Sequence, residues 1–291
     1  MSKVINIEQM SSWVLNKKHS EQTYVIEEYD DETPGFHAIK INSMEHLVCL
    51  IEQLLQDGLH NQFIFRGQRN SDWKLQSSLE REIKSIKTQE QYNEIAQKHL
   101  SNFKKLARGK IREQSLLLGN SEENNEELWA IGQHLGLKTP LVDWTRSFLI
   151  ALFFAFYKEK TETTYRCVYR LFEGLLNIDE KHKYIVNPKM DHYGRLTSQK
   201  GLFTYWGIDF HIKNLLIAFD NVTPSSLSRD TKQRKVITKY YISNELRKDI
   251  LNYLEKYGIT EDSIYPDLSG IINKANNELK EIINSSNHSG G

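Results

Sequence analysis

A strand that ends in an arginine and a glycine is the first segment whose residue types suit chemistry. The apolar run Phe63–Phe65 predicts a short strand, and Arg66, Gly67 and Gln68 follow it directly. An arginine presents a planar fork of N–H donors that fits a phosphate or a carboxylate, and a glycine lets a ligand approach the backbone. We therefore expect this strand end to face an anionic ligand. A solvated arginine at an ordinary strand end is the alternative.

A second segment places polar residues before the most apolar run of the chain, residues 148–157. These polar residues are Gln133, His134, Asp143, Trp144, Thr145 and Ser147. Hydroxyls and carboxylates at such positions cap the free N–H groups of a helix, so capping alone explains at least one of them. The same helix end attracts anions. The flat face of Trp144 suits either the core or a stacked ring.

The third segment covers residues 195–204, in which Arg195 and Gln199 stand before Gly201 and a short apolar stretch. The amide of Gln199 can both donate and accept hydrogen bonds, and Gly201 permits a close approach. An ordinary turn into a strand explains the same pattern. If the three segments meet in the fold, their guanidinium and hydroxyl groups form one pocket for an anionic molecule.

The elements that must position these residues follow from the hydrophobic pattern and from helix start and stop signals. Helices are predicted between Ser43 and Gly58, over 78–114, 128–136 and 148–157, between Ser243 and Gly258, and over 266–279. Strands are predicted over 62–66, 165–172, 214–220 and 235–242. Helices crowd the first half, so we expect an α+β fold with a helix-rich N-terminal half and a mixed or antiparallel sheet around a buried helix. Three parts are expected: an N-terminal portion (1–60) packed on a main domain (61–283), and a disordered tail (284–291).

Composition narrows the classes of partner. The 291 residues carry 38 basic and 38 acidic side chains, which argues against a general nucleic-acid footprint. One local basic run, residues 104–112, could still contact nucleic acid, although a solvated helix face explains it equally. The longest apolar run has ten residues, whereas a bilayer span needs about 20. We expect no membrane partner.

Cysteine and histidine usage bears on metals and location. Cys49 and Cys167 are the only two cysteines, too few for a disulfide framework or a zinc site of their own. A reducing, cytoplasmic location fits this usage, and the N-terminus lacks the order of a secretory signal. None of the ten histidines shows a clear metal-ligand spacing, so no metal is expected.

These segments resemble the FRG domain family, which is named for the tripeptide Phe65-Arg66-Gly67. The opening motif continues with Trp73, Leu75, Ser78, Leu79 and Arg81. The stretch from Gln133 to Ala155 resembles the longest motif, and residues 195–204 and 264–270 resemble two later ones. One departure is clear, since Pro140 stands where the family has an arginine. Lys138 or Arg146 is a candidate to replace that charge.

The FRG family has no firmly established general activity, and it occurs in bacteria and phages in settings that suggest defence or toxin roles. The layout also resembles, more loosely, ADP-ribosyltransferases and their fold. That resemblance implies NAD as a substrate and a protein or nucleic acid as acceptor. Arg66 would hold NAD with Gly67, Gln68, Arg81, Gln133, Trp144 and Arg195 around it, and Thr145 and Ser147 would order the pocket. Gln199 would face the ribose, with Asp143 or His134 as further catalytic candidates.

Two other classes stay open. The same arginines suit a binding module for a nucleotide, a phosphate or an RNA end without turnover. A nuclease using Asp143 and His134 ranks lowest, because the chain lacks the clustered acids of a two-metal site.

Overall fold

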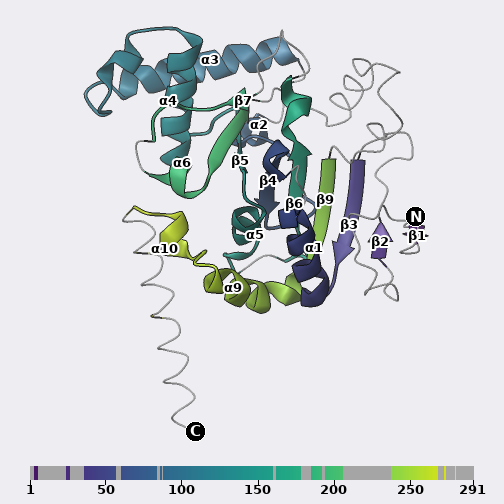
Figure 1. Ribbon diagram of the computed structural model, residues 1–291. Coiled ribbons are helices and arrows are strands. Elements are labelled where there is room, and N and C mark those ends of the chain that lie inside the picture. Colours follow the sequence, from purple (N-terminus) through teal and green to yellow (C-terminus); the bar gives the residue numbers. More distant parts are fainter. Residues whose placement is uncertain are drawn as a thin grey trace.

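The fold is built on one mixed sheet, seen in the centre of Figure 1. The computed structural model describes residues 3–5, 24–26, 36–56, 60–83, 86, 88–159, 162–177, 185–191, 194–205, 237–267, 272 and 279. Within this part of the chain, seven strands follow the order β3-β9-β6-β4-β5-β8-β7. Strands β3 and β9 pair in parallel, and every other neighbouring pair is antiparallel.

The strands of this sheet are β3 (Phe36–Ile41), β4 (Phe63–Gln68), β5 (Leu141–Thr145), β6 (Tyr165–Phe172), β7 (Ile185–Val186), β8 (Gly201–Tyr205) and β9 (Ile237–Ser243). Two short strands, β1 (Lys3–Ile5) and β2 (Tyr24–Ile26), form a separate antiparallel pair. The α-helices are α1 (Met44–Gln56), α2 (Ser78–Glu82), α3 (Gln89–Leu106), α4 (Glu122–His134), α5 (Phe148–Phe156), α6 (Arg195–Ser198), α9 (Arg247–Lys256) and α10 (Glu261–Ile264). Short 3₁₀ turns are η3 (His60–Gln62), η4 (Gln114–Leu117), η5 (Glu173–Asn177) and η6 (Asn244–Leu246).

Helix α5 is the buried helix that the apolar run predicts. It is apolar on nearly every side, which suits a helix inside the core. It packs between the sheet and the pair α1 and α9, whose apolar faces complete this cluster. Helices α3 and α4 cover a second cluster with β5, β7 and β8, and they lie at the other end of the molecule (Figure 1).

Two arginines from distant parts of the chain stabilise the C-terminal end of α5, which has no basic residue in its last turn. Arg166 is fully buried and donates from Nη1 to the carbonyls of Ala155 and Lys158, 2.8 Å each. Arg247 donates to the carbonyls of Phe156 and Tyr157, 3.0 Å each. Positive groups at this end satisfy unpaired carbonyls and oppose the negative end of the helix dipole. They fix where α5 ends against the sheet.

Strands β4 and β5 are neighbours in the sheet but pair only at Phe65 and Thr145. Beyond that pair, the strands make no further ladder contacts. Along β4, Phe63 and Phe65 face the α5 cluster, whereas Ile64 belongs to the cluster on the other face. Because strand side chains alternate, Arg66 lies on the Ile64 face, at the point where β4 and β5 separate.

Several predicted elements are confirmed. The mixed sheet around a buried helix matches the expected fold class. Strand β6 has the predicted bounds, and β9 lies within two residues of its predicted range. Ser43 accepts the backbone N–H of His46 at the start of α1, and Ser243 and Gly258 bracket η6 and α9.

Other element bounds were predicted wrongly. The region 78–114 is not one helix, because Ile83 ends α2 and Thr88 caps the start of α3. Helix α4 begins at Glu122, not Leu128, since Ser121 accepts the N–H of Asn124 and the polar residues that follow form its outer turns. The polar residues 122–127 indicated a loop before the helix, but they form its first turns.

Some predictions fall on residues that the structure does not describe. The strand over 214–220 and the tail 284–291 lie outside the described residues, as does most of the helix over 266–279. In the helices that are described, no segment is both long enough and apolar enough to cross a membrane.

Candidate functional site

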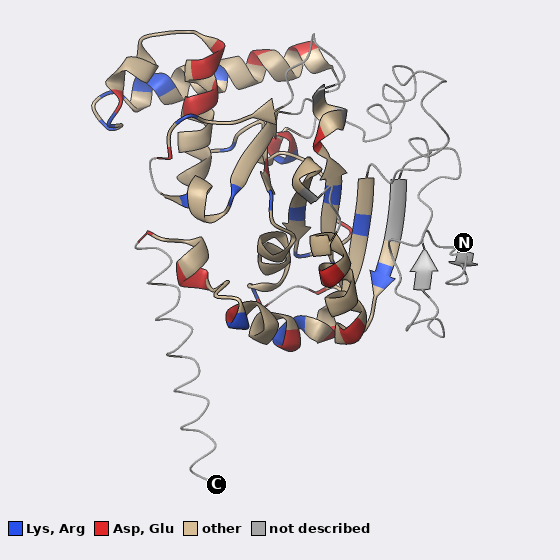
Figure 2. Cartoon of the chain, viewed as in Figure 1, with Lys and Arg blue, Asp and Glu red and all other residues tan. Residues whose placement is uncertain are grey.

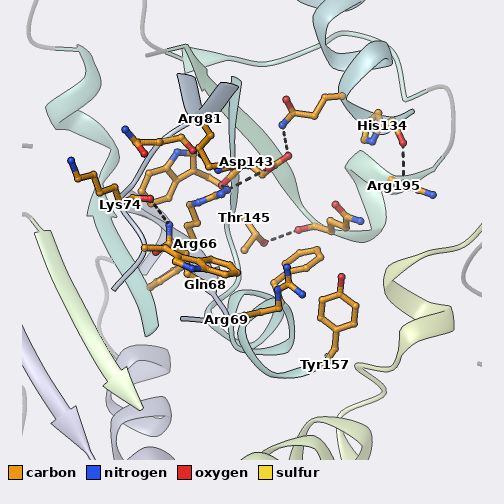
Figure 3. A pocket seen from close by; sticks show the side chains of 18 of the residues that line it. Arg66, Gln68, Arg69, Lys74, Arg81, His134, Asp143, Thr145, Tyr157 and Arg195 are labelled. Atoms are coloured by element: carbon orange, nitrogen blue, oxygen red, sulfur yellow. Dashed lines mark hydrogen bonds and ion pairs between the residues drawn. The ribbon is translucent and has the colours of Figure 1, made fainter. Parts of the chain in front are cut away.

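A cavity of about 740 Å³ opens where β4 and β5 separate, and the three segments singled out in the sequence meet there. Figure 3 shows its side chains converging from β4, β5, α2, α4, α5 and α6. The predicted site residues that line it are Arg66, Gly67, Gln68, Arg81, Gln133, His134, Asp143, Trp144, Thr145, Arg195 and Gln199. Ser147 is the one predicted residue that is not among the lining residues given for this cavity.

Arg66 and Asp143 form the centre of the cavity, as Figure 3 shows. Arg66 Nη1 donates to the backbone carbonyl of Asp143 at 2.7 Å and lies 3.4 Å from its carboxylate Oδ2. The Arg66 side chain is only 16% exposed, whereas that of Asp143 is 61% exposed. The arginine therefore bridges the gap between β4 and β5, and the carboxylate stays open to solvent and to a ligand.

A second contact fixes the other oxygen of this carboxylate. Gln133 Nε2, near the end of α4, donates to Asp143 Oδ1 at 2.6 Å. The side-chain oxygen Oε1 of Gln133 in turn accepts a hydrogen bond from the hydroxyl of the fully buried Thr139. This chain of hydrogen bonds explains the Gln-His segment and the Thr-Pro turn in physical terms: they orient Asp143, because both of its oxygens have fixed donors.

Positive charge dominates the cavity wall. Its basic side chains are Arg66, Arg69, Lys74, Arg81 and Arg195, and its acidic ones are Asp72 and Asp143. With His134 neutral, five positive and two negative charges leave a net charge of +3. Figure 2 shows that acidic residues lie mostly on the helices, whereas basic residues lie on both helices and strands. Although the whole chain is neutral, this hollow attracts anions.

Arg81 lies close enough to Arg66 for the two charges to affect each other. Arg81 is exposed as a residue, yet partial burial of its guanidinium lowers its pKa, and the charge of Arg66 lowers that pKa further. Asp143, Glu80 and Glu82 oppose the shift without reversing it. Two like charges held near one another favour an anion between them.

His134 occupies the end of the cavity beside Arg195. Burial lowers the pKa of its imidazole, opposed by the Asp143 carboxylate and aided by the charge of Arg195. Its ring packs edge-on against Phe203, with centroids 6.2 Å apart, and its backbone carbonyl faces Arg195 Nη1 at 3.4 Å. The imidazole is therefore neutral near pH 7, and its partly buried ring helps to form the wall.

Gly67 makes room for α5, and its role in the approach of a ligand stays a prediction, since Gly67 also lines the cavity. A Cβ on Gly67 would lie 1.9 Å from the carbonyl oxygen of Ala151 and 2.8 Å from the backbone nitrogen of Ala155. Both atoms belong to the backbone of α5, which cannot move aside as a side chain can. The glycine of the tripeptide is thus needed for the close packing of helix on strand.

The hydroxyls of the second segment are structural. Thr145 is buried, and its Oγ1 donates to the Gln199 carbonyl at 2.6 Å while accepting the N–H of Ser147 at 3.1 Å. Ser147 caps α5 by accepting the N–H of Ile150. The other two capping candidates, Asp143 and Thr145, lie within β5. Thr145 orders the cavity by tying β5 to the turn that carries Gln199.

Gln199 is held by the last residue of α10, and Arg195 by residues that follow this helix. Gln199 Nε2 donates to the carbonyl of Ile264 at 3.2 Å. Arg195 Nε pairs with the Asp267 carboxylate, and its guanidinium lies 5.4 Å from the ring centroid of Tyr265. The Tyr265 hydroxyl contacts that of Tyr157 on α5 at 3.4 Å. Both predicted ligand groups are therefore engaged in closing one side of the cavity.

Two more predicted residues belong to the floor of the cavity. Gln68 is buried, donates to the carbonyl of Lys74 at 3.3 Å and faces the Cys167 thiol. Burial raises the pKa of Cys167 to about 12, so this thiol is no nucleophile at neutral pH. Trp144 is 4% exposed and donates from its indole to Thr204 at 2.9 Å. Of the two roles proposed for Trp144, packing in the core fits this burial and stacking on a ligand ring does not.

The candidates to replace the family arginine lie outside the cavity. Lys138 pairs with Glu82 at 3.0 Å, Arg146 pairs with Glu173, and neither lines the cavity. The expectation that one of them restores the charge is wrong. The position itself, Pro140, is buried.

Sequence reasoning missed several lining residues. These are Arg69, Asp72, Trp73, Lys74, Gln76, Phe154, Tyr157 and Tyr265. Arg69 lies over the ring of Trp73, 5.3 Å from its centroid, and Trp73 is 45% exposed. The sequence offered one signal for these residues, since Trp73 lies among the charged residues that follow the tripeptide.

Comparisons with known proteins identify one part of the chain. No curated protein and no solved structure matched it. Residues 61–164 match the family model of the FRG domain. This range holds the tripeptide, Arg81, Gln133, Asp143 and α5, whereas the two later motifs lie beyond it. The chain therefore contains an FRG domain, and the matched residues supply the Arg66–Asp143 centre of the cavity.

Proposed function

We propose that the cavity binds a nucleotide by its phosphates and acts on NAD, releasing nicotinamide and passing ADP-ribose to water or to an acceptor. The observation that carries this proposal is an exposed carboxylate, Asp143, fixed inside a hollow of net positive charge. The volume of about 740 Å³ falls in the usual range for small-molecule sites. Aromatic side chains on its wall suit a base or a nicotinamide ring.

The chemistry requires a negative group near the ribose. The bond between ribose C1′ and the nicotinamide nitrogen breaks, and its electron pair leaves with nicotinamide. Positive charge then develops on the ribose, and a fixed carboxylate stabilises it. A water or acceptor hydroxyl adds to C1′ and loses its proton. Gln199 carries no negative charge, so Asp143 takes the role of the acid in this proposal.

The test measures nicotinamide release from NAD by the purified protein, alone and with a bacterial lysate that supplies acceptors. Asp143→Asn should reduce release about 100-fold or more, as loss of one group that stabilises developing charge does elsewhere. Glu94→Gln is the matched control, because it neutralises a carboxylate that is exposed on α3 and paired only with Lys98. If wild type neither binds nor consumes NAD under either condition, the proposal fails.

A second candidate is nucleotide binding without turnover. It is favoured by the closeness of Arg66 to Asp143, since a paired guanidinium weakens the field of the carboxylate. Binding of NAD or ADP without nicotinamide release, even with lysate, would support it over the first proposal. Toxicity on expression in bacteria, relieved by Asp143→Asn, would instead link turnover to a defence or toxin role.

The nucleic-acid alternative draws less support from the structure. Lys104, in the basic run on α3, donates to Gly119, Asn120 and Asn125 and is thus used within the fold. For the nuclease alternative, the described residues contain no group of three His, Cys, Asp or Glu side chains placed to hold a metal ion.

A further inference from the structure

Not all of the cavity's positive charges are equally free to bind a ligand. Arg66 lies 3.4 Å from Asp143, and Arg195 pairs with Asp267. For Arg69, Lys74 and Arg81, the described part of the chain provides no carboxylate within ion-pair distance. All three come from one stretch, residues 69–81, which runs from the end of β4 into α2.

Of these three, Arg81 is the one whose side chain a hydrogen bond to described residues holds in place while donors remain for a phosphate. Its Nη1 donates to the backbone carbonyl of Gln76 at 3.0 Å, the one hydrogen bond that its side chain makes to described residues. This bond holds the side chain in place and leaves the Nη2 and Nε edge for a bidentate contact. Arg69 instead covers the ring of Trp73, and Lys74 is an exposed point charge.

Arg66 has a competing use for its donors. Its Nη1 serves both the Asp143 carbonyl and the carboxylate, and its Nε is buried without a partner among the described residues. Moving Arg66 onto a phosphate would remove the support of Asp143. An anion bound to Arg81 would also relieve the repulsion between Arg81 and Arg66.

We propose that Arg81, not the arginine of the FRG tripeptide, is the main phosphate-binding residue of this cavity, and that Arg66 positions Asp143. This inference rests on the proposed nucleotide-binding function and assigns its parts. Arg81 gives the cavity its preference for a phosphorylated ligand, and Arg66 holds the Asp143 carboxylate in the position that the reaction requires.

The experiment compares two probes, ADP and adenosine, by isothermal titration calorimetry. The dissociation constant for adenosine divided by that for ADP isolates the contribution of the phosphates. Arg81→Gln should reduce that ratio roughly ten- to hundredfold while leaving the adenosine constant unchanged. Lys98→Gln is the matched control, because it removes one positive charge from an exposed position on α3 outside the cavity. Arg66→Gln should reduce the ratio far less than Arg81→Gln does.

Each outcome is decisive. If wild type binds ADP but Arg81→Gln keeps the wild-type ratio, this inference is wrong and the proposed function stands. The inference is also wrong if Arg66→Gln lowers the ratio as much as Arg81→Gln. If wild type binds neither ADP nor NAD, the proposed function itself fails. Thermal melting of each variant shows that it is folded, and Arg81→Lys, which keeps the charge but not the fork, should recover only part of the ratio.

Discussion

Replacing Gly67 by alanine tests whether this glycine serves helix packing or ligand access. The added Cβ would lie 1.9 Å from the Ala151 oxygen, and real Cβ contacts essentially never fall below 3.0 Å. The difference is 1.1 Å, so α5 or β4 must shift by about that distance. Inserting a methyl group into a packed core costs about 1–3 kcal/mol, occasionally more, and we expect the upper end because both contacted groups are backbone.

The assay is urea and thermal unfolding followed by circular dichroism. A loss of about 3 kcal/mol should lower the melting temperature by roughly 5–10 °C in a chain of this size. Gly201→Ala is the matched control, since its Cβ would meet first the flexible end of Leu196, at 3.2 Å. If Gly67→Ala is as stable as Gly201→Ala but binds NAD or ADP more weakly, the packing argument is refuted and the glycine serves the ligand.

Two further predictions concern the cavity wall. Thr145→Val removes the buried hydroxyl that joins β5 to Gln199, so the free energy of unfolding should fall by about 1–3 kcal/mol in urea titrations; an unchanged value would mean that this link contributes nothing. Because the folded-state pKa of His134 is lowered, the unfolded chain binds a proton first as pH falls, so His134 reduces stability progressively below its unfolded pKa of about 6.5. Unfolding measured from pH 7.5 to pH 5 should therefore show a smaller loss of stability in His134→Gln than in wild type, and equal slopes would contradict the burial argument.

The meeting of the three segments was predictable because each places polar residues at the end of an apolar element. Arg66 lies near the end of β4, and Ser147 and Gln199 lie at helix ends. The ends of apolar strands and helices lie at the edge of a core, where their polar side chains can line one cavity. The individual roles were not predictable in the same way, because they depend on contacts between residues far apart in sequence, such as the 77 residues between Arg66 and Asp143.

Two examples show where a local sequence pattern does not predict the structure. Asp143 and Thr145 look like helix-capping residues because of their polar side chains, yet they lie in β5, since pairing with β8 decides the outcome. The close approach of α5 to Gly67 cannot be read from the sequence of β4 alone. In both cases a tertiary contact overrides the local signal.

The position of β9 in the sheet has a consequence for biosynthesis. This strand lies between β3 and β6, although it is made about two hundred residues after β3. The carbonyl of Ile264 and the carboxylate of Asp267, which hold Gln199 and Arg195, emerge later still. A ribosome-bound chain that ends before residue 237 thus lacks both an inner strand and one wall of the cavity. The site can form only once translation has passed these residues, so incomplete products carry the tripeptide without a finished cavity.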